Sequence, residues 1–285
     1  MEFGIDTWIG YPALDLPSIL QLVENSGFRY IEYAFEHFRE LEYSGRIDEL
    51  NEYIEYIADA ASTTRLKPLQ IHAPYGRVAK MMGSTDENER KKGIEILSRW
   101  IRYAALLQVP IIVVHVARAK PYPGKSYKQF IEVLYKRNIE SFKKLVKVCK
   151  NYGVKIAVEN RLERWFGVAP EDLVSLINDV DPDYLGICLD TGHAHVNEYD
   201  IPEIVKNIKE HLIATHIHDN DGTRDQHYPP LMGSIKWTAV LKAFKEIGYP
   251  YPLILEIAGG TTIQQVKNKI HLTRIITEKL LSEDI

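Results

Sequence analysis

Short apolar runs alternate with longer amphipathic segments along the whole chain. The runs are rich in β-branched residues, which is typical of buried parallel strands. We predict strands at 2–9, 30–35, 68–73, 110–116, 155–159, 185–190, 213–218 and 252–257. The segments between them have helical spacing and predict helices at 16–26, 47–64, 87–108, 127–152, 170–180, 201–211, 235–247 and 262–281. Eight strand–helix units in 285 residues predict a (β/α)8 barrel.

The sequence shows no internal boundary. No Ser/Gly-rich linker or shift in composition divides it, so we expect residues 1–285 to form one barrel domain. A doubly wound open sheet is the alternative, but no G-x-G-x-x-G follows the first predicted strand.

Composition and charge limit the partners and the cellular location that we expect for the protein. The chain is 45% hydrophobic and 26% charged, as soluble globular proteins are. A net charge of −4 disfavours a nucleic-acid partner without excluding one, since local patches matter more than totals. The first residues do not resemble a signal peptide, and no apolar run reaches the roughly 18 residues of a membrane span. We therefore expect a cytoplasmic protein with no membrane partner.

Ionisable side chains gather at one end of the predicted strands, where a barrel carries its active site. They are Glu32, His72, His115, Glu159, Asp190, His216 and Glu256, followed closely by His193, Asp225 and His227. Each has an ordinary explanation by itself: a hydrogen-bonded core histidine, a helix N-cap or a polar loop. Ten of them at the same end are costly to bury unless they bind something. Carboxylates together with imidazoles suit a divalent transition metal such as Zn²⁺ or Mn²⁺.

Strand alternation supports a common inward face for these groups. Ala157 and Glu159 share a face, so a small residue lies below the carboxylate. His216 and His218 also share a face, and one of them must lie a layer higher than the other.

Six motifs together resemble a known superfamily. They are IHAPY at 71–75, the strand ending in His115, EN at 159–160, LDTGHA at 189–194, HIHDNDGTRDQH at 216–227 and LE at 255–256. In this order they resemble the xylose-isomerase-like TIM barrels, which include sugar and sugar phosphate isomerases and epimerases together with endonuclease IV. The resemblance covers nearly the whole chain and agrees with the predicted barrel.

The resemblance implies roles for individual residues. It places a core metal, Zn²⁺, Mn²⁺ or Co²⁺, on Glu159, Asp190, His216 and Glu256. Additional metal positions would be His72 and His115 with Glu159 as a bridge, and His193, Asp225 and His227. Substrate contacts would come from Glu32, His193 and Arg224. For Arg224 the alternative is a surface ion pair with Asp221 or Asp225.

Two enzymatic activities are consistent with this set of residues. The first is a metal-dependent sugar or sugar phosphate isomerase or epimerase, in which Glu159 and Glu256 transfer a proton next to a ketose carbonyl through an enediolate. The second is an endonuclease IV-like hydrolase of phosphodiesters at abasic sites, since all nine ligand positions of its multinuclear cluster are kept. A binding protein with a vestigial metal site is a third class, and no missing ligand supports it.

Three features favour the sugar enzyme. Glu32 ends a strand as in the sugar enzymes, no Pro-Gly follows His115, and the stretch 218–227 resembles an uncharacterised sugar-isomerase branch. We therefore expect a small sugar substrate, and the superfamily resemblance is compatible with a homo-oligomer. The segment with Arg161, Arg164, Trp165 and Phe166 is interpreted as a lid over this substrate, with DNA contact as the alternative.

Overall fold

The computed structural model describes residues 1–162 and 166–282. In these ranges eight parallel strands form one sheet in the order β7-β6-β5-β4-β3-β2-β1-β8. They are β1 (Phe3–Asp6), β2 (Tyr30–Tyr33), β3 (Lys67–His72), β4 (Ile111–His115), β5 (Lys155–Glu159), β6 (Leu185–Asp190), β7 (Leu212–His216) and β8 (Leu253–Leu255). Just beyond β7, Ile217 bridges to Leu255, which nearly closes the ring. The predicted (β/α)8 fold is confirmed.

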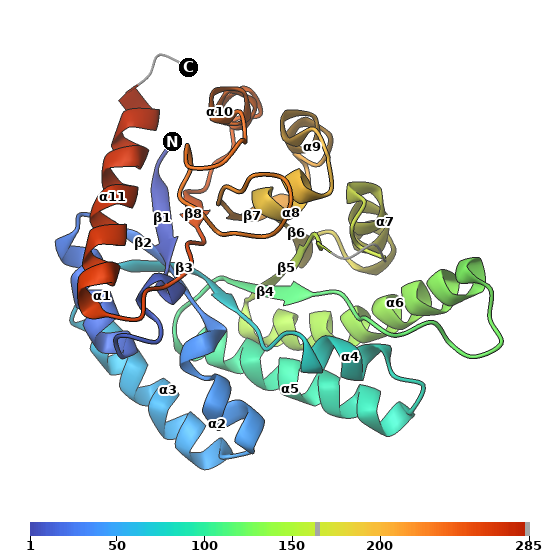
Figure 1. Ribbon diagram of the computed structural model, residues 1–285. Coiled ribbons are helices and arrows are strands. Elements are labelled where there is room, and N and C mark those ends of the chain that lie inside the picture. The colour runs from blue at the N-terminus through green and yellow to red at the C-terminus, as the bar shows by residue number, and fades with distance from the viewer. Residues whose placement is uncertain (163–165, 283–285) are drawn as a thin grey trace.

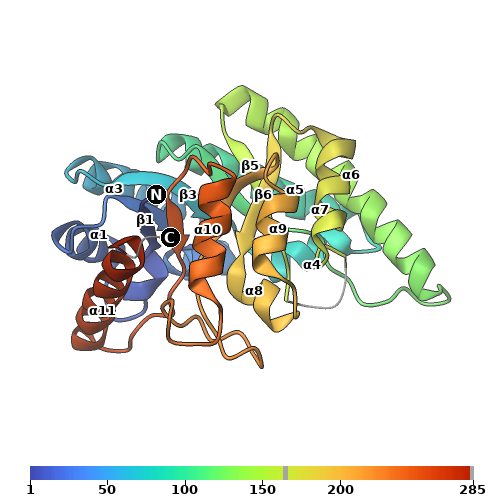
Figure 2. The ribbon, with the colours of Figure 1, turned by 90° about the horizontal axis from the view of Figure 1, so that it is seen from above.

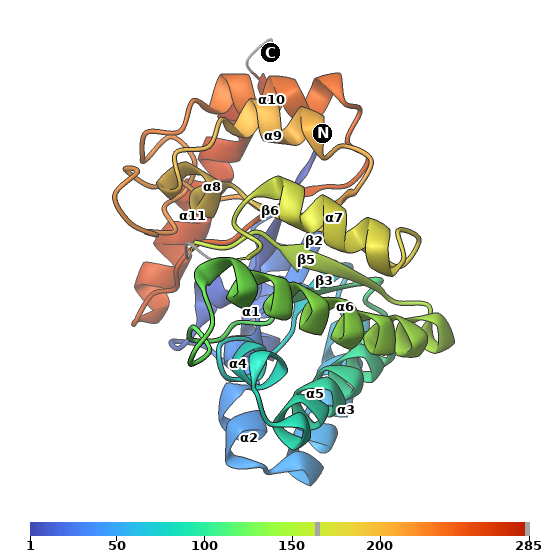
Figure 3. The same cartoon turned by 90° about the vertical axis from the view of Figure 1, so that its right-hand side faces the viewer.

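Helices surround the strands, and α11 (red) completes the circle beside β1 and α1 (Figure 1). The α-helices are α1 (Leu16–Asn25), α2 (Arg39–Ser44), α3 (Ile47–Ser62), α4 (Arg77–Gly83), α5 (Glu87–Leu106), α6 (Tyr127–Tyr152), α7 (Pro170–Val180), α8 (Thr191–Val196), α9 (Ile201–Asn207), α10 (Trp237–Glu246) and α11 (Ile263–Ser282). Two 3₁₀ turns, η1 (Thr7–Gly10) and η2 (Phe35–His37), follow β1 and β2. Figure 3 shows α6 and α7 in front of β5, the side on which they cover the sheet.

Local sequence explains where the long helices begin and end. Asp15 caps α1 by accepting a hydrogen bond from the Ser18 amide at 2.9 Å. Ser126 and Gln129 form a reciprocal capping box at the start of α6. Gly153 ends α6 with a φ of 68°, a left-handed conformation that favours glycine. No helix among residues 1–162 and 166–282 is long and apolar enough to cross a membrane.

The barrel interior has its own small apolar layer. Ile111, Val113, Ala157, Cys188 and Ala214 form this layer, separate from the large core between strands and helices. The next inward position on each of the four strands, two residues later, carries an ionisable side chain: His115, Glu159, Asp190 and His216. The polar cluster therefore lies directly above an apolar floor, as strand alternation predicts.

The predicted strands exist, but six of them, including β1, β7 and β8, end earlier than expected. β1 stops at Asp6 because the Asp6 side chain accepts a hydrogen bond from the Trp8 amide and begins η1. β7 ends at His216 and β8 at Leu255, so the polar residues that follow lie in loops. In Figure 2, α8 and the orange loop after β7 project on one side of the barrel.

Candidate metal centre and cavity

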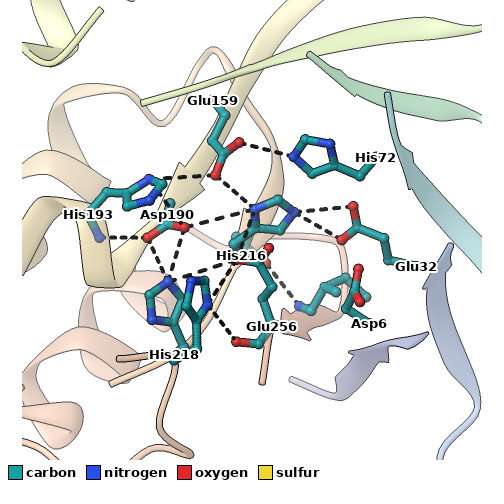
Figure 4. Close-up of polar contacts among 12 residues, drawn as sticks. Asp6, Glu32, His72, Glu159, Asp190, His193, His216, His218 and Glu256 are labelled. Carbon is teal, nitrogen blue, oxygen red and sulfur yellow. Dashed lines mark hydrogen bonds and ion pairs between the residues drawn. The ribbon is translucent and has the colours of Figure 1, made fainter. Parts of the chain in front are cut away.

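Four strand-end residues meet above the apolar floor. Glu159, Asp190, His216 and Glu256 each offer a ligand atom within 4.8 Å of the others. The His216 Nδ1 atom lies 3.1 Å from Glu159 Oε1, 3.6 Å from Glu256 Oε2 and 4.0 Å from Asp190 Oδ2 (Figure 4). The structure thus brings together the four residues expected to hold the core metal.

A second group shares Glu159 with the first. The Glu159 Oε2 atom is 2.6 Å from His115 Nε2 and 3.4 Å from His72 Nε2. Oε1 faces His216 and Oε2 faces the two histidines, so Glu159 lies between the first group and the second.

The third group differs from the prediction by one residue. Its members are His218, Asp225 and His227, with His227 Nε2 at 2.9 Å and His218 Nδ1 at 3.8 Å from Asp225. The predicted member His193 lies between two carboxylates instead, 3.4 Å from Asp190 and 3.3 Å from Asp225. His218 also contacts Asp190 at 3.0 Å, so it is a site residue that sequence reasoning missed. The available signal was its shared strand face with His216.

Hydrogen bonds to the far side of each ring fix the orientation of four histidines. The Nδ1 atoms of His72, His193 and His227 lie 2.7, 2.9 and 3.2 Å from backbone carbonyl oxygens, to which Nδ1–H donates. The Nε2–H of His216 donates to Glu32 at 3.0 Å. Each arrangement turns the other ring nitrogen toward the carboxylates, as in metal sites whose histidines are oriented by outer hydrogen bonds.

Orphaned polar atoms provide a separate test of whether a metal fits. Within the described part of the chain, His218 Nδ1, Asp225 Oδ1 and Glu256 Oε2 are buried without a hydrogen-bond partner. Buried polar atoms are rarely left unpaired, and these are nitrogen and carboxylate donors of the kind that Zn²⁺ binds. The donor set therefore fits a divalent cation.

Burial and mutual contact shift the pKa values of these groups in different directions. Burial favours a neutral Glu159, but His115 and His216 hold its pKa well below the usual range. Burial raises the pKa of Glu256, against the effect of His216 and His227. Despite burial, the Asp190 and Asp225 carboxylates raise the pKa of His193 to about 10, whereas burial lowers the pKa of His115 to about 4. The two catalytic candidates, Glu159 and Glu256, thus differ in proton affinity.

The expected substrate contact of Glu32 is wrong. The β2–β3 register shifts between Ile31 and Glu32, which places Glu32 beside Gln70, two residues before His72. Glu32 is fully buried there and accepts hydrogen bonds from Gln70 Nε2 at 2.7 Å and from His216. Its position one layer below the ligands makes it a support for His216.

Two other predicted features lie outside the centre or outside the described residues. Arg224 is exposed in the loop after β7 and does not line the cavity, so its expected substrate contact is not seen. In the proposed lid segment, Arg164 and Trp165 lie outside the described residues, whereas Arg161 and Phe166 are buried.

A cavity of about 240 Å³ opens above the cluster. It is lined by Asp6, Trp8, Glu36, His72, Tyr75, His115, Glu159, His193, Asp225, His227 and Glu256. Pockets for drug-sized ligands span roughly 300–1,000 Å³, so this cavity suits a smaller molecule. Sequence reasoning missed Asp6 because the apolar residues that follow it were included in the first strand. It missed Glu36 because this residue lies in a short turn without periodicity.

The profile of the "Xylose isomerase-like TIM barrel" family matches residues 20–275. The chain belongs to this family. Among relatives of this xylose isomerase-like barrel, the uncharacterised protein MJ1311 of Methanocaldococcus jannaschii is 26% identical over 100% of this chain and 93% of its own length. A D-psicose 3-epimerase of Ruminiclostridium cellulolyticum is 26% identical, over 53% of this chain and 51% of that enzyme. A "Probable endonuclease 4" of Mycoplasma mycoides subsp. mycoides SC is also 26% identical, over 56% of each chain.

Solved structures share the fold of this xylose isomerase-like barrel over its full length. A D-tagatose 3-epimerase-like protein superposes with a TM-score of 0.79 at 24% identity, over 99% of this chain and 97% of that one. The IOLI protein, whose structure has a bound zinc atom, superposes with a TM-score of 0.73 at 22% identity, over 99% of this chain and 96% of that one. These likenesses establish the architecture.

Proposed function

We propose that this protein is a metal-dependent sugar or sugar phosphate isomerase or epimerase. The observation that carries the proposal is that Glu159 and Glu256 converge on one small cavity beside oriented histidines. Proton transfer next to a carbonyl needs a base and an acid within reach of one substrate. Sugar 3-epimerases among the relatives support the same class of reaction.

The metal would be held by Glu159, Asp190, Glu256 and one of the histidines His216 and His218. A divalent cation bound there supplies Lewis-acid polarisation of a carbonyl oxygen. His193, which lines the cavity with its Nε2 side toward Asp225, would donate a hydrogen bond to a substrate oxygen. The zinc atom in the IOLI structure supports a metal in this fold.

The two glutamates would divide the proton transfer between them. Glu159, whose pKa is lowered by His115 and His216, stays ionised and takes the proton from the carbon next to the carbonyl. Glu256 would return a proton to the substrate. Delivery to the opposite face of the same carbon gives an epimer, and delivery to the adjacent carbon gives an isomer.

A phosphodiesterase acting at abasic sites is the second candidate. The observation that favours it is that two additional ligand groups form around His72 and His115 and around Asp225 and His227. Such a cluster would position a hydroxide for attack on phosphorus and neutralise developing charge. Endonuclease 4 proteins among the relatives support this alternative.

One experiment separates the two candidates. Purified protein is loaded separately with Mn²⁺, Co²⁺ and Zn²⁺, and deuterium uptake from heavy water into ketoses and ketose phosphates is measured beside nicking of an abasic duplex. We expect uptake that is lost in Glu159→Gln and retained in Asp225→Asn, with Glu210→Gln, 77% exposed, as the matched control. Nicking that is lost in Asp225→Asn, without uptake into any sugar, would establish the nuclease instead.

A further inference from the structure

Four residues that line the cavity come from segments other than those of the metal-ligand groups and have a different chemistry. Asp6 ends β1, Trp8 lies in η1, Glu36 lies in η2, and Tyr75 follows β3. None of these four belongs to the three ligand groups. They lie beside those groups, since the Trp8 ring centre is 4.8 Å from that of His227 and the Tyr75 ring centre is 5.4 Å from that of His115. A molecule that reaches the ligand groups is therefore also within reach of these side chains.

Asp6 is aimed into the cavity from a buried position. Asp6 is only 2% exposed, yet it lines the cavity. Figure 4 places it beside Glu256. The Oδ1 atom accepts a hydrogen bond from the Trp8 amide. The carboxyl group lines the cavity, so a ligand there can reach it, and burial together with the Glu32 and Glu256 carboxyls raises the pKa of Asp6 well above the usual range.

Glu36 is held in place from outside the cavity. The Tyr75 hydroxyl donates a hydrogen bond to Glu36 Oε1. Arg39 Nη2 in turn donates to the Tyr75 hydroxyl at 3.0 Å, and its guanidinium lies 5.4 Å from the Tyr75 ring centre. This chain fixes the Glu36 carboxyl and leaves the arginine outside the cavity lining.

The charge of the cavity lining discriminates between kinds of substrate. Among the described residues, no lysine or arginine lines the cavity, while Asp6 and Glu36 add carboxyl groups to it. Carboxylates accept hydrogen bonds from hydroxyl groups. A phosphate is bound by cationic side chains or backbone amides, and like charges placed together cost several kcal/mol.

We propose that Asp6 and Glu36 form a subsite for hydroxyl groups of an unphosphorylated sugar, and that this subsite rejects a phosphate group. The inference rests on the proposed function and goes beyond it, because it chooses the neutral sugar over the sugar phosphate. Trp8 completes the wall with an apolar surface against which carbon-bound hydrogens of a sugar can pack.

The test compares D-fructose with D-fructose 6-phosphate on the metal-loaded full-length protein. Isothermal titration calorimetry gives the Kd of each compound, and deuterium uptake is measured in parallel. We expect the Kd of the phosphate to be at least about tenfold higher. Glu36→Gln should narrow this ratio to about threefold or less, whereas Glu40→Gln, 88% exposed, should leave it unchanged.

The outcomes separate this inference from the proposed function. D-fructose 6-phosphate that binds as tightly as D-fructose, or a ratio of the two Kd values that Glu36→Gln leaves unchanged, overturns the subsite. Absence of binding by either compound also overturns it. If the protein binds D-fructose more tightly than its phosphate but D-fructose, D-psicose and D-tagatose take up no deuterium, the subsite is supported. The proposed proton-transfer function is then contradicted. Circular dichroism confirms that each variant is folded.

Discussion

Replacement of Glu32 by glutamine tests whether a buried carboxyl group below the site supports its histidine. Glu32 accepts from His216 Nε2 at 3.0 Å and from Gln70 Nε2 at 2.7 Å, and the same Gln70 nitrogen donates to the Thr215 carbonyl at 3.2 Å. In Glu32→Gln, the new amide oxygen can still accept from His216. The new NH₂ group then faces the Gln70 NH₂ group, and turning Gln70 over would place its oxygen against the Thr215 carbonyl.

The substitution thus leaves at least one buried donor or acceptor unsatisfied, which costs about 1–3 kcal/mol of the free energy of unfolding. The loss of the orienting partner of a metal-binding histidine typically weakens metal affinity about 10–100-fold. We expect both effects, measured by urea denaturation of the metal-free protein and by competition for Zn²⁺ with a calibrated chelator. Glu210→Gln, at the surface, is the control. A Zn²⁺ Kd within about twofold of wild type, with unchanged stability, would refute a supporting role for Glu32.

Three further changes have defined outcomes. Gly192→Ala would place a Cβ in the ring of His218, so we expect it to displace that ring and lower the metal content of the purified protein, measured by elemental analysis; an unchanged content would contradict a ligand role for His218. Free Zn²⁺ at 100 times its Kd should raise the free energy of unfolding by about 2.7 kcal/mol, and Glu159→Gln should reduce this increase. Burial lowers the pKa of His37 despite Glu36 and Asp15, so the neutral form is favoured in the native state. The stabilisation of the native state by neutral His37 is fully present above the unfolded-state pKa of about 6.5 and is lost as the pH falls. Urea titrations at pH 7 and pH 5 should therefore show that the free energy of unfolding falls more in wild type than in His37→Gln. A larger fall in the variant would contradict a lowered pKa of His37 in the native state.

The barrel and the inward-facing ligands were predictable because both depend on regular periodicity. β-branched runs predicted every strand, and the alternation of Ala157 with Glu159 correctly placed the carboxylate above an apolar layer. These features follow from side-chain direction along a strand. Predicting them does not depend on the conformation of the loops.

The parts that could not be predicted depend on irregular backbone. The β2–β3 pairing places Glu32 beside Gln70, two residues before His72, and nothing in its sequence indicates this register. Asp6 was hidden because Thr7, Trp8 and Ile9 are good strand formers, although the Asp6 side chain starts a 3₁₀ turn. His218 follows the end of β7, and the only signal for it was the strand face that it shares with His216.

The ligand groups cannot by themselves decide which reaction this barrel performs. Proton transfer in a sugar and hydrolysis of a phosphodiester both use a divalent cation held by carboxylates and histidines, and relatives named for either activity align with this chain. The distinction lies in the rest of the cavity wall. A phosphodiester leaves negative charge on both sides of the reacting phosphorus, so a nuclease needs cationic groups or backbone amides around it. Here that wall presents Asp6 and Glu36 instead, which favours a neutral substrate rich in hydroxyl groups.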